Sequence, residues 1–274
     1  MPSRSELFPL AVTSEMLFLD LPYLDRVRRI AELGFQVEMW DWTAKDLDAV
    51  ADIGATWSTM TGYVHGDLYD ADGGAELVRT ARLAVEAARK LDCPRLVVHG
   101  AELDGSRGGV PFRPQPVTTG QMWLNAYRTL GELADLGEAN GVVFCLENLN
   151  LEVDHPGVPF GRAEDTITLV GTLDRPGVRL MLDLYHAQIG EGNLVELIRR
   201  AGPLIGEVQV ADVPGRREPG TGEINWRAIA GALREIDYTG VVGLESFASG
   251  DDVAACEAFR AAFSGPHPEE DVRR

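Results

Sequence analysis

Four polar residues end apolar runs in the second half of the chain. The runs are VVFCLEN, VRLMLDLYH, GEVQVAD and VVGLES, and their polar residues are Glu147, Asp183, Gln209 and Glu245. A carboxylate at the end of a buried strand needs compensation, because an unpaired buried ion is very costly. Three carboxylates brought together would also raise one another's pKa values unless a cation lay among them. The pattern therefore predicts a divalent metal site.

The ligand types indicate which metal this site would hold. Carboxylate and amide oxygens suit Mg²⁺ or Mn²⁺, and zinc is a weaker candidate because no thiolate belongs to the set. The three cysteines, Cys93, Cys145 and Cys256, are odd in number and have no CxxC spacing. This argues against a disulfide framework and a structural zinc site, so we interpret them as ordinary buried or half-buried thiols.

Eight β-rich apolar runs alternate with eight amphipathic segments, a pattern typical of parallel strands with helical crossovers. The predicted strands are Phe8–Val12, Phe35–Trp40, Ala55–Thr61, Arg95–His99, Val142–Glu147, Val178–Asp183, Ile205–Ala211 and Val241–Glu245. The predicted helices are Leu21–Leu33, Lys45–Ile53, Gly74–Leu91, Thr119–Asn140, Ala163–Leu173, Leu194–Ala201, Trp226–Ile236 and Val253–Phe263. Strict alternation favours a single (β/α)8 TIM barrel of the α/β class over an open doubly wound sheet. In such a barrel the four polar residues would meet at the carboxyl ends of the strands.

The length of 274 residues and the 45% hydrophobic content fit one barrel domain. We expect the catalytic barrel to span residues 1–265 and the polar C-terminal tail, residues 266–274, to be disordered. Two long segments, Ala101–Thr118 and Asn150–Gly161, follow the fourth and fifth strands. Long loops at this face of a barrel often contact substrate or act as lids.

The chain is strongly acidic, with 43 acidic against 25 basic side chains and a net charge of −18. This charge repels nucleic acid and anionic membrane surfaces, and an anionic substrate would need a local cation from a metal or an arginine. The first residues lack a signal-peptide pattern, and no stretch approaches the ~18 apolar residues of a membrane span. We therefore expect a cytoplasmic protein that acts on a small molecule.

Three motifs resemble the hydroxypyruvate isomerase family, within the xylose-isomerase-like barrel superfamily. They are LENLN at Leu146–Asn150, LDLYHAQ at Leu182–Gln188 and VADVPGRREPGTGEINW at Val210–Trp226. The EPGTGE run is the most specific piece, and the resemblance covers about Val142 to Phe247. The first half of the chain resembles the family only in organisation.

The resemblance implies roles for individual residues. The metal ligands would be Glu147, Asp183, Gln209 and Glu245, and the two glutamates would also form the acid/base pair. His186 would be metal-adjacent or contact the substrate, and Glu218 and Gly220 would belong to the loop that closes the site. Related sugar epimerases usually carry histidine in place of Gln209, which favours the hydroxypyruvate isomerase branch. The family pattern leads us to expect histidine or glycine at position 217, so Arg217 departs from it. Barrels of this group often form homo-oligomers.

Further candidates come from residue type and from position after the predicted strands. His65 and His99 follow the third and fourth strands and could bind substrate, although a polar loop residue is the commoner explanation. Arg216 and Arg217 follow the seventh strand and could grip a substrate carboxylate bidentately, a role that depends on the family resemblance, against the alternative of solvated loop arginines. Three aromatic residues could wall the pocket or pack in the core, namely Trp40, Trp57 and Tyr63.

The leading interpretation is an aldose–ketose type isomerase that converts hydroxypyruvate to 2-hydroxy-3-oxopropanoate (tartronate semialdehyde), or a close 2-oxo acid such as a 2-oxo-tetronate. Two glutamates would move protons through a cis-enediolate, with the metal stabilising the developing charge. A ketose 3-epimerase is the nearest alternative. A metal-dependent phosphodiesterase such as an AP endonuclease fits poorly with five histidines and the acidic charge. A barrel that only binds a ligand is a further alternative.

Overall fold

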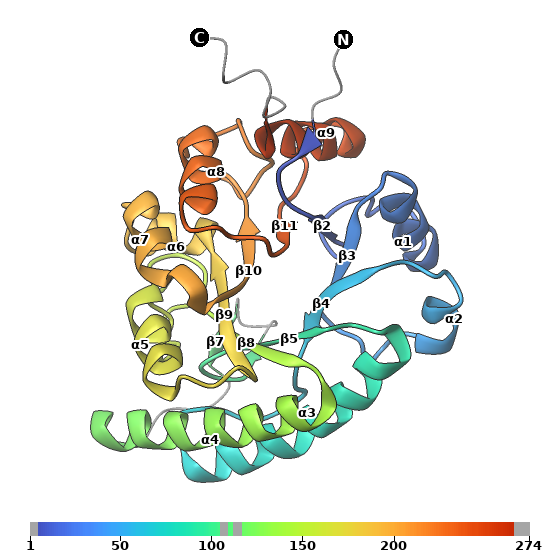
Figure 1. Ribbon diagram of the computed structural model, residues 1–274. Helices are drawn as coiled ribbons and strands as arrows, with labels where there is room; N and C mark the ends of the chain where they lie inside the picture. The colour runs from blue at the N-terminus through green and yellow to red at the C-terminus, as the bar shows by residue number, and fades with distance from the viewer. Residues whose placement is uncertain (1–4, 105–108, 112–116, 266–274) are drawn as a thin grey trace.

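Eight parallel strands form a closed barrel in the computed structural model, which describes residues 5–104, 109–111 and 117–265 (Figure 1). Around the barrel the strands follow the order β10-β11-β2-β3-β4-β5-β8-β9, and β9 pairs with β10 to close it. The strands are β2 (Leu10–Thr13), β3 (Gln36–Met39), β4 (Trp57–Thr61), β5 (Arg95–Val98), β8 (Val143–Glu147), β9 (Val178–Asp183), β10 (Ile205–Val210) and β11 (Val242–Leu244). The TIM-barrel prediction is confirmed, and each predicted strand corresponds to one of these.

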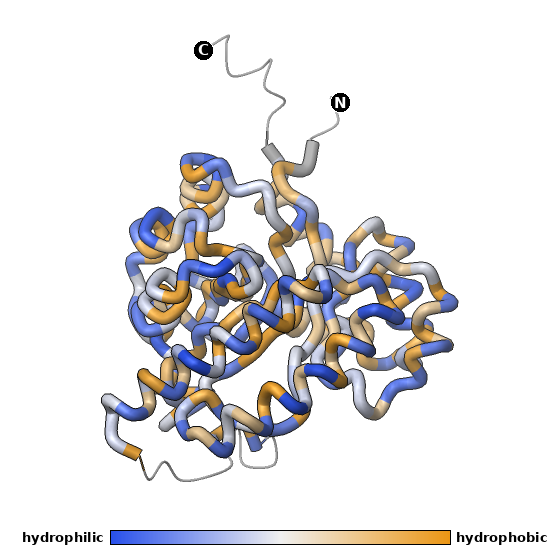
Figure 2. Tube along the Cα trace, turned by 60° about the horizontal axis from the view of Figure 1, so that its bottom comes forward, coloured by the Kyte–Doolittle hydropathy of each residue, from blue (hydrophilic) through white to orange (hydrophobic). Residues whose placement is uncertain are grey.

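Helices surround the barrel and cover the outer faces of its strands (Figure 1). The eight predicted helices correspond to α1 (Tyr23–Glu32), α2 (Leu47–Ala51), α3 (Ala71–Leu91), α4 (Thr119–Asn140), α5 (Ala163–Leu173), α7 (Leu194–Ala201), α8 (Trp226–Glu235) and α9 (Asp252–Ala262). Colours alternate between hydrophobic and hydrophilic along these helices in Figure 2, as expected for helices with one face on a barrel. In α1, for example, Val27 and Ile30 are buried.

Local capping explains where two of the long helices begin. The α3 helix starts three residues before the predicted position because the Asp70 side chain accepts a hydrogen bond from the Gly73 N–H. Thr118 and Gln121 form a capping box at the start of α4. The α3 and α4 helices run side by side across one flank of the barrel (Figure 1).

Several short elements were not predicted from the sequence. The α6 helix (Leu184–Gly190) follows β9 directly, and a 3-10 turn (Gly202–Leu204) precedes β10. The loop after β5 contains the strands β6 (Leu103–Asp104) and β7 (Val110–Pro111). A ribbon of β1 (Ser5–Glu6) and β12 (Ser264–Gly265) joins the two ends of the described chain at the amino-end face of the barrel.

The predicted tail at 266–274 lies outside the described residues. No helix in the described ranges combines the length and hydropathy that crossing a bilayer requires. All three cysteines are free and buried, which confirms their interpretation as ordinary thiols.

Candidate active site

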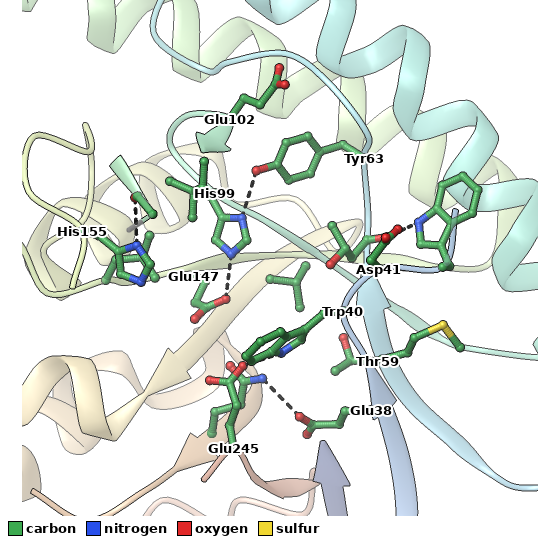
Figure 3. Close-up of a pocket in the computed structure, with 18 of the residues that line it drawn as sticks. Glu38, Trp40, Asp41, Thr59, Tyr63, His99, Glu102, Glu147, His155 and Glu245 are labelled. Atoms are coloured by element: carbon green, nitrogen blue, oxygen red, sulfur yellow. Dashed lines mark hydrogen bonds and ion pairs between the residues drawn. The ribbon is translucent and has the colours of Figure 1, made fainter. Parts of the chain in front are cut away.

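A pocket of about 630 Å³ opens at the carboxyl ends of the barrel strands (Figure 3). Its position matches the face where barrel enzymes carry their active sites. The predicted site residues that line it are Glu147, Gln209, Glu245, His99, His186 and Arg216. Trp40 and Tyr63 also line the pocket, whereas Trp57 is buried in the core.

Three of the predicted carboxylates meet beside this pocket. One ligand atom from each of Glu147, Asp183, Glu245 and His186 lies within 4.8 Å of the others, and all four residues are buried. Glu147 and Asp183 are the last residues of β8 and β9, and Glu245 follows β11. Burial, together with the charge of Glu245, raises the pKa of Asp183 well above its usual value. A cation placed among these groups would remove the conflict.

Gln209 projects from β10 next to this cluster, because its Cα pairs in register with that of Asp183 on β9. Its Nε2 donates to Glu38 Oε2 at 3.2 Å, which fixes the orientation of the amide. The Oε1 atom is buried and has no hydrogen-bond partner among the described residues. A buried amide oxygen without a donor suits a metal ligand, so the chemistry of the donor set fits a hard divalent cation.

The hydrogen bonds of His186 determine which of its ring nitrogens carries the proton. Asn150 Oδ1 accepts from the backbone N–H groups of Val153 and Asp154, so its Nδ2 points toward His186 Nδ1 at 2.7 Å. Nδ1 must therefore accept, and the proton of the neutral ring lies on Nε2. Burial lowers the pKa of His186 well below its usual value, which keeps the ring neutral. His186 consequently offers an N–H donor toward the carboxylates rather than a metal ligand.

Glu245 is held by two donors on opposite sides. Trp40 Nε1 donates to Oε1 at 2.7 Å, and Arg216 Nη2 donates to Oε2 at 2.5 Å. The guanidinium of Arg216 also lies 4.9 Å from the centre of the Tyr185 ring, and its buried Nε has no partner among the described residues. Burial opposes the charged form, but the carboxylates of Glu245 and Asp183 raise the pKa of Arg216 above its usual value. Arg216 is thus a cation inside the pocket.

Arg216 lies in the loop after β10, and other residues of this loop support it without lining the pocket. Asp212 accepts hydrogen bonds from Trp226 Nε1 and from the Gly220 N–H, both at 2.9 Å. Glu218 accepts from the Ser249 N–H at 2.8 Å and from Ser249 Oγ at 2.5 Å. Glu218 and Gly220 therefore brace the loop, and neither is among the pocket-lining residues.

The two histidines predicted from strand ends differ in their surroundings. His99 lies in the pocket between Tyr63 and Glu147 (Figure 3). His65 is more than half exposed, lies within 2.9 Å of Glu102, and does not line the pocket. Arg217 is exposed and donates to the Ala248 carbonyl oxygen.

Glu38 and His155 are among the pocket residues that were not predicted from the sequence. Glu38 lies inside the apolar run FQVEMW and is followed by Met39 and Trp40, so it does not end its run as the four predicted residues do. A carboxylate within a predicted strand was the signal that could have indicated it. Its Oε2 accepts from Thr13 Oγ1 at 2.7 Å, and a Cβ at Gly243 would come within 1.7 Å of its Oε1. His155 lies in the long loop after β8 and hydrogen-bonds to the Gly109 carbonyl oxygen; only its place in that loop pointed to it.

The comparisons with known proteins agree with the fold. The family model described as xylose isomerase-like TIM barrel matches residues 27–270. The 2-oxo-tetronate isomerase of Haemophilus influenzae is 30% identical, over 91% of this chain and 97% of that protein. A Danio rerio protein named "Putative hydroxypyruvate isomerase" is 28% identical, over 89% of this chain and 91% of that protein. A crystal structure of an AP endonuclease, family 2, from Brucella melitensis has a TM-score of 0.81 and 26% identity, over 94% of this chain and all of that one. The chain belongs to the xylose isomerase-like TIM barrel family.

Proposed function

We propose that this chain is a divalent-metal-dependent isomerase of a short 2-oxo hydroxy acid, of the hydroxypyruvate or 2-oxo-tetronate type. The observation that carries the proposal is the buried group of three carboxylates, with the unpartnered oxygen of Gln209 on the neighbouring strand, beside a pocket. The names of the curated relatives point to the same reaction class.

Four residues would hold the metal, namely Glu147, Asp183, Gln209 and Glu245. Their oxygen atoms suit Mg²⁺ or Mn²⁺. When bound, such an ion supplies positive charge that stabilises the negative charge developing on the substrate oxygens.

Glu147 and Glu245 would carry the protons. They come from β8 and β11, which are separated by two strands in the barrel, so the two carboxylates reach the pocket from different directions. One takes the proton from the carbon next to the carbonyl, and the other returns a proton to the adjacent carbon of the enediolate. The Nε2–H of His186 is available to donate to a substrate oxygen.

Arg216 would hold the carboxylate of the substrate. It is the cation that an acidic chain needs to bind an anion, and its unpartnered Nε leaves a donor available. Its contact with Glu245 would bring the carboxylate end of the substrate next to one of the two acid/base groups.

A ketose 3-epimerase is the second candidate, because a pocket of about 630 Å³ also has room for a five- or six-carbon ketose. Gln209, in place of the histidine usual in sugar epimerases, favours the isomerase. A nuclease fits less well, since the net charge of −18 repels a phosphate backbone and the cluster contains one imidazole.

The test is an activity screen of hydroxypyruvate, 2-oxo-tetronates and free ketoses, with EDTA and metal add-back, followed by NMR in D₂O. An isomerase moves the carbonyl, whereas an epimerase keeps the carbonyl in place and inverts a neighbouring centre. If the protein converts ketoses but neither hydroxypyruvate nor the 2-oxo-tetronates, the ketose 3-epimerase replaces the isomerase as the proposed function. If Glu147→Gln and Glu245→Gln leave the natural function intact while metal still binds, the chain is a binding barrel.

A further inference from the structure

We propose that His99 is a positioning residue for Glu147, and that Tyr63 selects the ring tautomer that makes this possible. The proposal rests on the proposed function, in which Glu147 transfers a proton. It changes the expected role of His99 from a substrate contact to a group that acts through a neighbouring carboxylate.

The three side chains form a continuous hydrogen-bonded row. Tyr63 follows β4, His99 follows β5 and Glu147 ends β8, and these strands are neighbours in the barrel. The Tyr63 hydroxyl lies 2.9 Å from His99 Nδ1, and His99 Nε2 lies 3.0 Å from Glu147 Oε2. Figure 3 shows the imidazole between the phenol and the carboxylate, with a dashed line on each side. His99 has a side-chain exposure of 17% and Glu147 of 6%, so the row is largely shielded from water.

The tyrosine hydroxyl has two acceptors within reach, and its choice fixes the tautomer of His99. The alternative acceptor is the Ala101 carbonyl oxygen, at the longer distance of 3.3 Å. If the hydroxyl donates to Nδ1, the ring proton lies on Nε2 and donates to Glu147. If it donates to Ala101 instead, Nδ1 carries the proton and a bare Nε2 faces a carboxylate oxygen. Only the first arrangement avoids placing two acceptors, His99 Nε2 and Glu147 Oε2, 3.0 Å apart with no proton between them, so it is the one the row favours.

A fixed N–H donor on Oε2 holds the plane of the Glu147 carboxylate. Orientation matters here, because small displacements of a reacting group can cost two orders of magnitude in rate. Glu245 is oriented by Trp40 and Arg216, which are permanent donors, whereas the donor on Glu147 depends on a tautomer. Tyr63 is buried, and burial raises the pKa of its hydroxyl well above the usual value, so it remains a donor.

The kinetic test compares His99→Gln with His99→Asn on the substrate that the screen identifies, at saturating metal. The two amides are chemically alike, but only the longer Gln can place an N–H near the position of Nε2. We expect His99→Asn to lower kcat by about 10- to 100-fold, with KM changed by less than about 3-fold, and His99→Gln to recover most of the rate. Tyr63→Phe should lower kcat as well. Tyr238→Phe is its control, since that hydroxyl donates to the Val241 carbonyl oxygen away from the pocket.

The second readout needs no turnover. In ¹⁵N-histidine-labelled protein, NMR of the ring nitrogens reports the tautomer, and the His99 signals are assigned by their loss in His99→Gln. We expect the tautomer protonated at Nε2, and a shift toward the Nδ1–H form in Tyr63→Phe. An Nδ1–H ring in the wild type overturns the proposal. Equal rates of the Gln and Asn variants, or a KM increase at constant kcat, overturn it too. A wild type that converts none of the candidate substrates would count against the proposed function, while the tautomer measurement would still test the inference.

Discussion

Replacing Asp212 by Asn should destabilise the loop that carries Arg216, because one carboxylate organises that whole segment. Oδ1 of Asp212 accepts from the N–H groups of Val213 at 3.0 Å and Ile224 at 3.1 Å. Oδ2 accepts from the Gly220 N–H and from Trp226 Nε1, both at 2.9 Å. Asp212 is fully buried, so water cannot replace a lost acceptor.

The size of the effect follows from counting acceptors. An asparagine keeps one carbonyl oxygen for two of the donors and turns an NH₂ group toward the other two. Hydrogen bonds to a charged group contribute about 1.5–3 kcal/mol each, so two lost bonds lower the free energy of unfolding by about 3–6 kcal/mol. This is a large part of the roughly 5–15 kcal/mol that stabilises a typical protein.

Urea unfolding followed by circular dichroism at pH 7, with EDTA present, measures this difference. Asp251→Asn is the matched control. Asp251 caps α9 by accepting from the Ala254 N–H, and Asn caps a helix about as well as Asp, so the change should stay within about 0.5 kcal/mol.

The pH dependence of the Asp212→Asn effect gives a second check. Burial by itself would raise the pKa of Asp212, but the hydrogen bonds from Trp226 and the backbone lower it below its usual value. The stability that this carboxylate contributes is therefore present above the unfolded pKa of about 3.9 and is lost as pH falls through the lower folded value. The difference in the free energy of unfolding between wild type and Asp212→Asn should become smaller in acid. Equal free energies of unfolding at pH 7, or a difference that does not change with pH, would refute the reasoning.

Four further outcomes are expected for the proposed site. EDTA should abolish turnover and Mg²⁺ or Mn²⁺ should restore it; activity that survives exhaustive chelation contradicts the metal assignment. Glu147→Gln and Glu245→Gln should each lower kcat by about 10²- to 10⁴-fold while the circular dichroism spectrum is retained, and a loss below tenfold would remove the residue from the acid/base pair. Arg216→Lys keeps the charge but not the planar fork, so KM should rise about tenfold for a carboxylate substrate and stay constant for a neutral ketose. Trp40→Phe removes one hydrogen bond to Glu245, and kcat should fall about tenfold; an unchanged pH–rate profile and kcat would show that this bond does not orient Glu245.

The barrel could be predicted from the sequence because apolar runs and amphipathic segments alternate with little interruption. The predicted bounds of α4, α5 and α7 match the structure. The α6 helix was missed because Asp183 has two local roles: it ends β9, and its side chain caps the next helix by accepting from the His186 N–H. A strand that passes directly into a helix leaves no turn signal between them.

The candidate site was predictable in part, since strand ends converge in any barrel. The sequence could place Glu147, Asp183 and Glu245 at one face, but it could not distinguish His99 from His65. Both follow strands, and only the pairing of strands far apart in the chain brings His99 to Glu147. The contacts of Arg216 could not be predicted either, because they depend on the conformation of its loop. Arg216 has a φ of 52°, in the left-handed region, and the spacing of residues in the sequence does not reveal such a conformation.

The ribbon of β1 and β12 has a consequence for engineering. Ser5 and Gly265 are Cα partners in an antiparallel pair, on the face of the barrel opposite the carboxylates. A short linker between these two positions would make a circular backbone, which could then be opened at another surface loop to give a permuted enzyme. An affinity handle or fused domain attached there would point away from the mouth through which ligands enter.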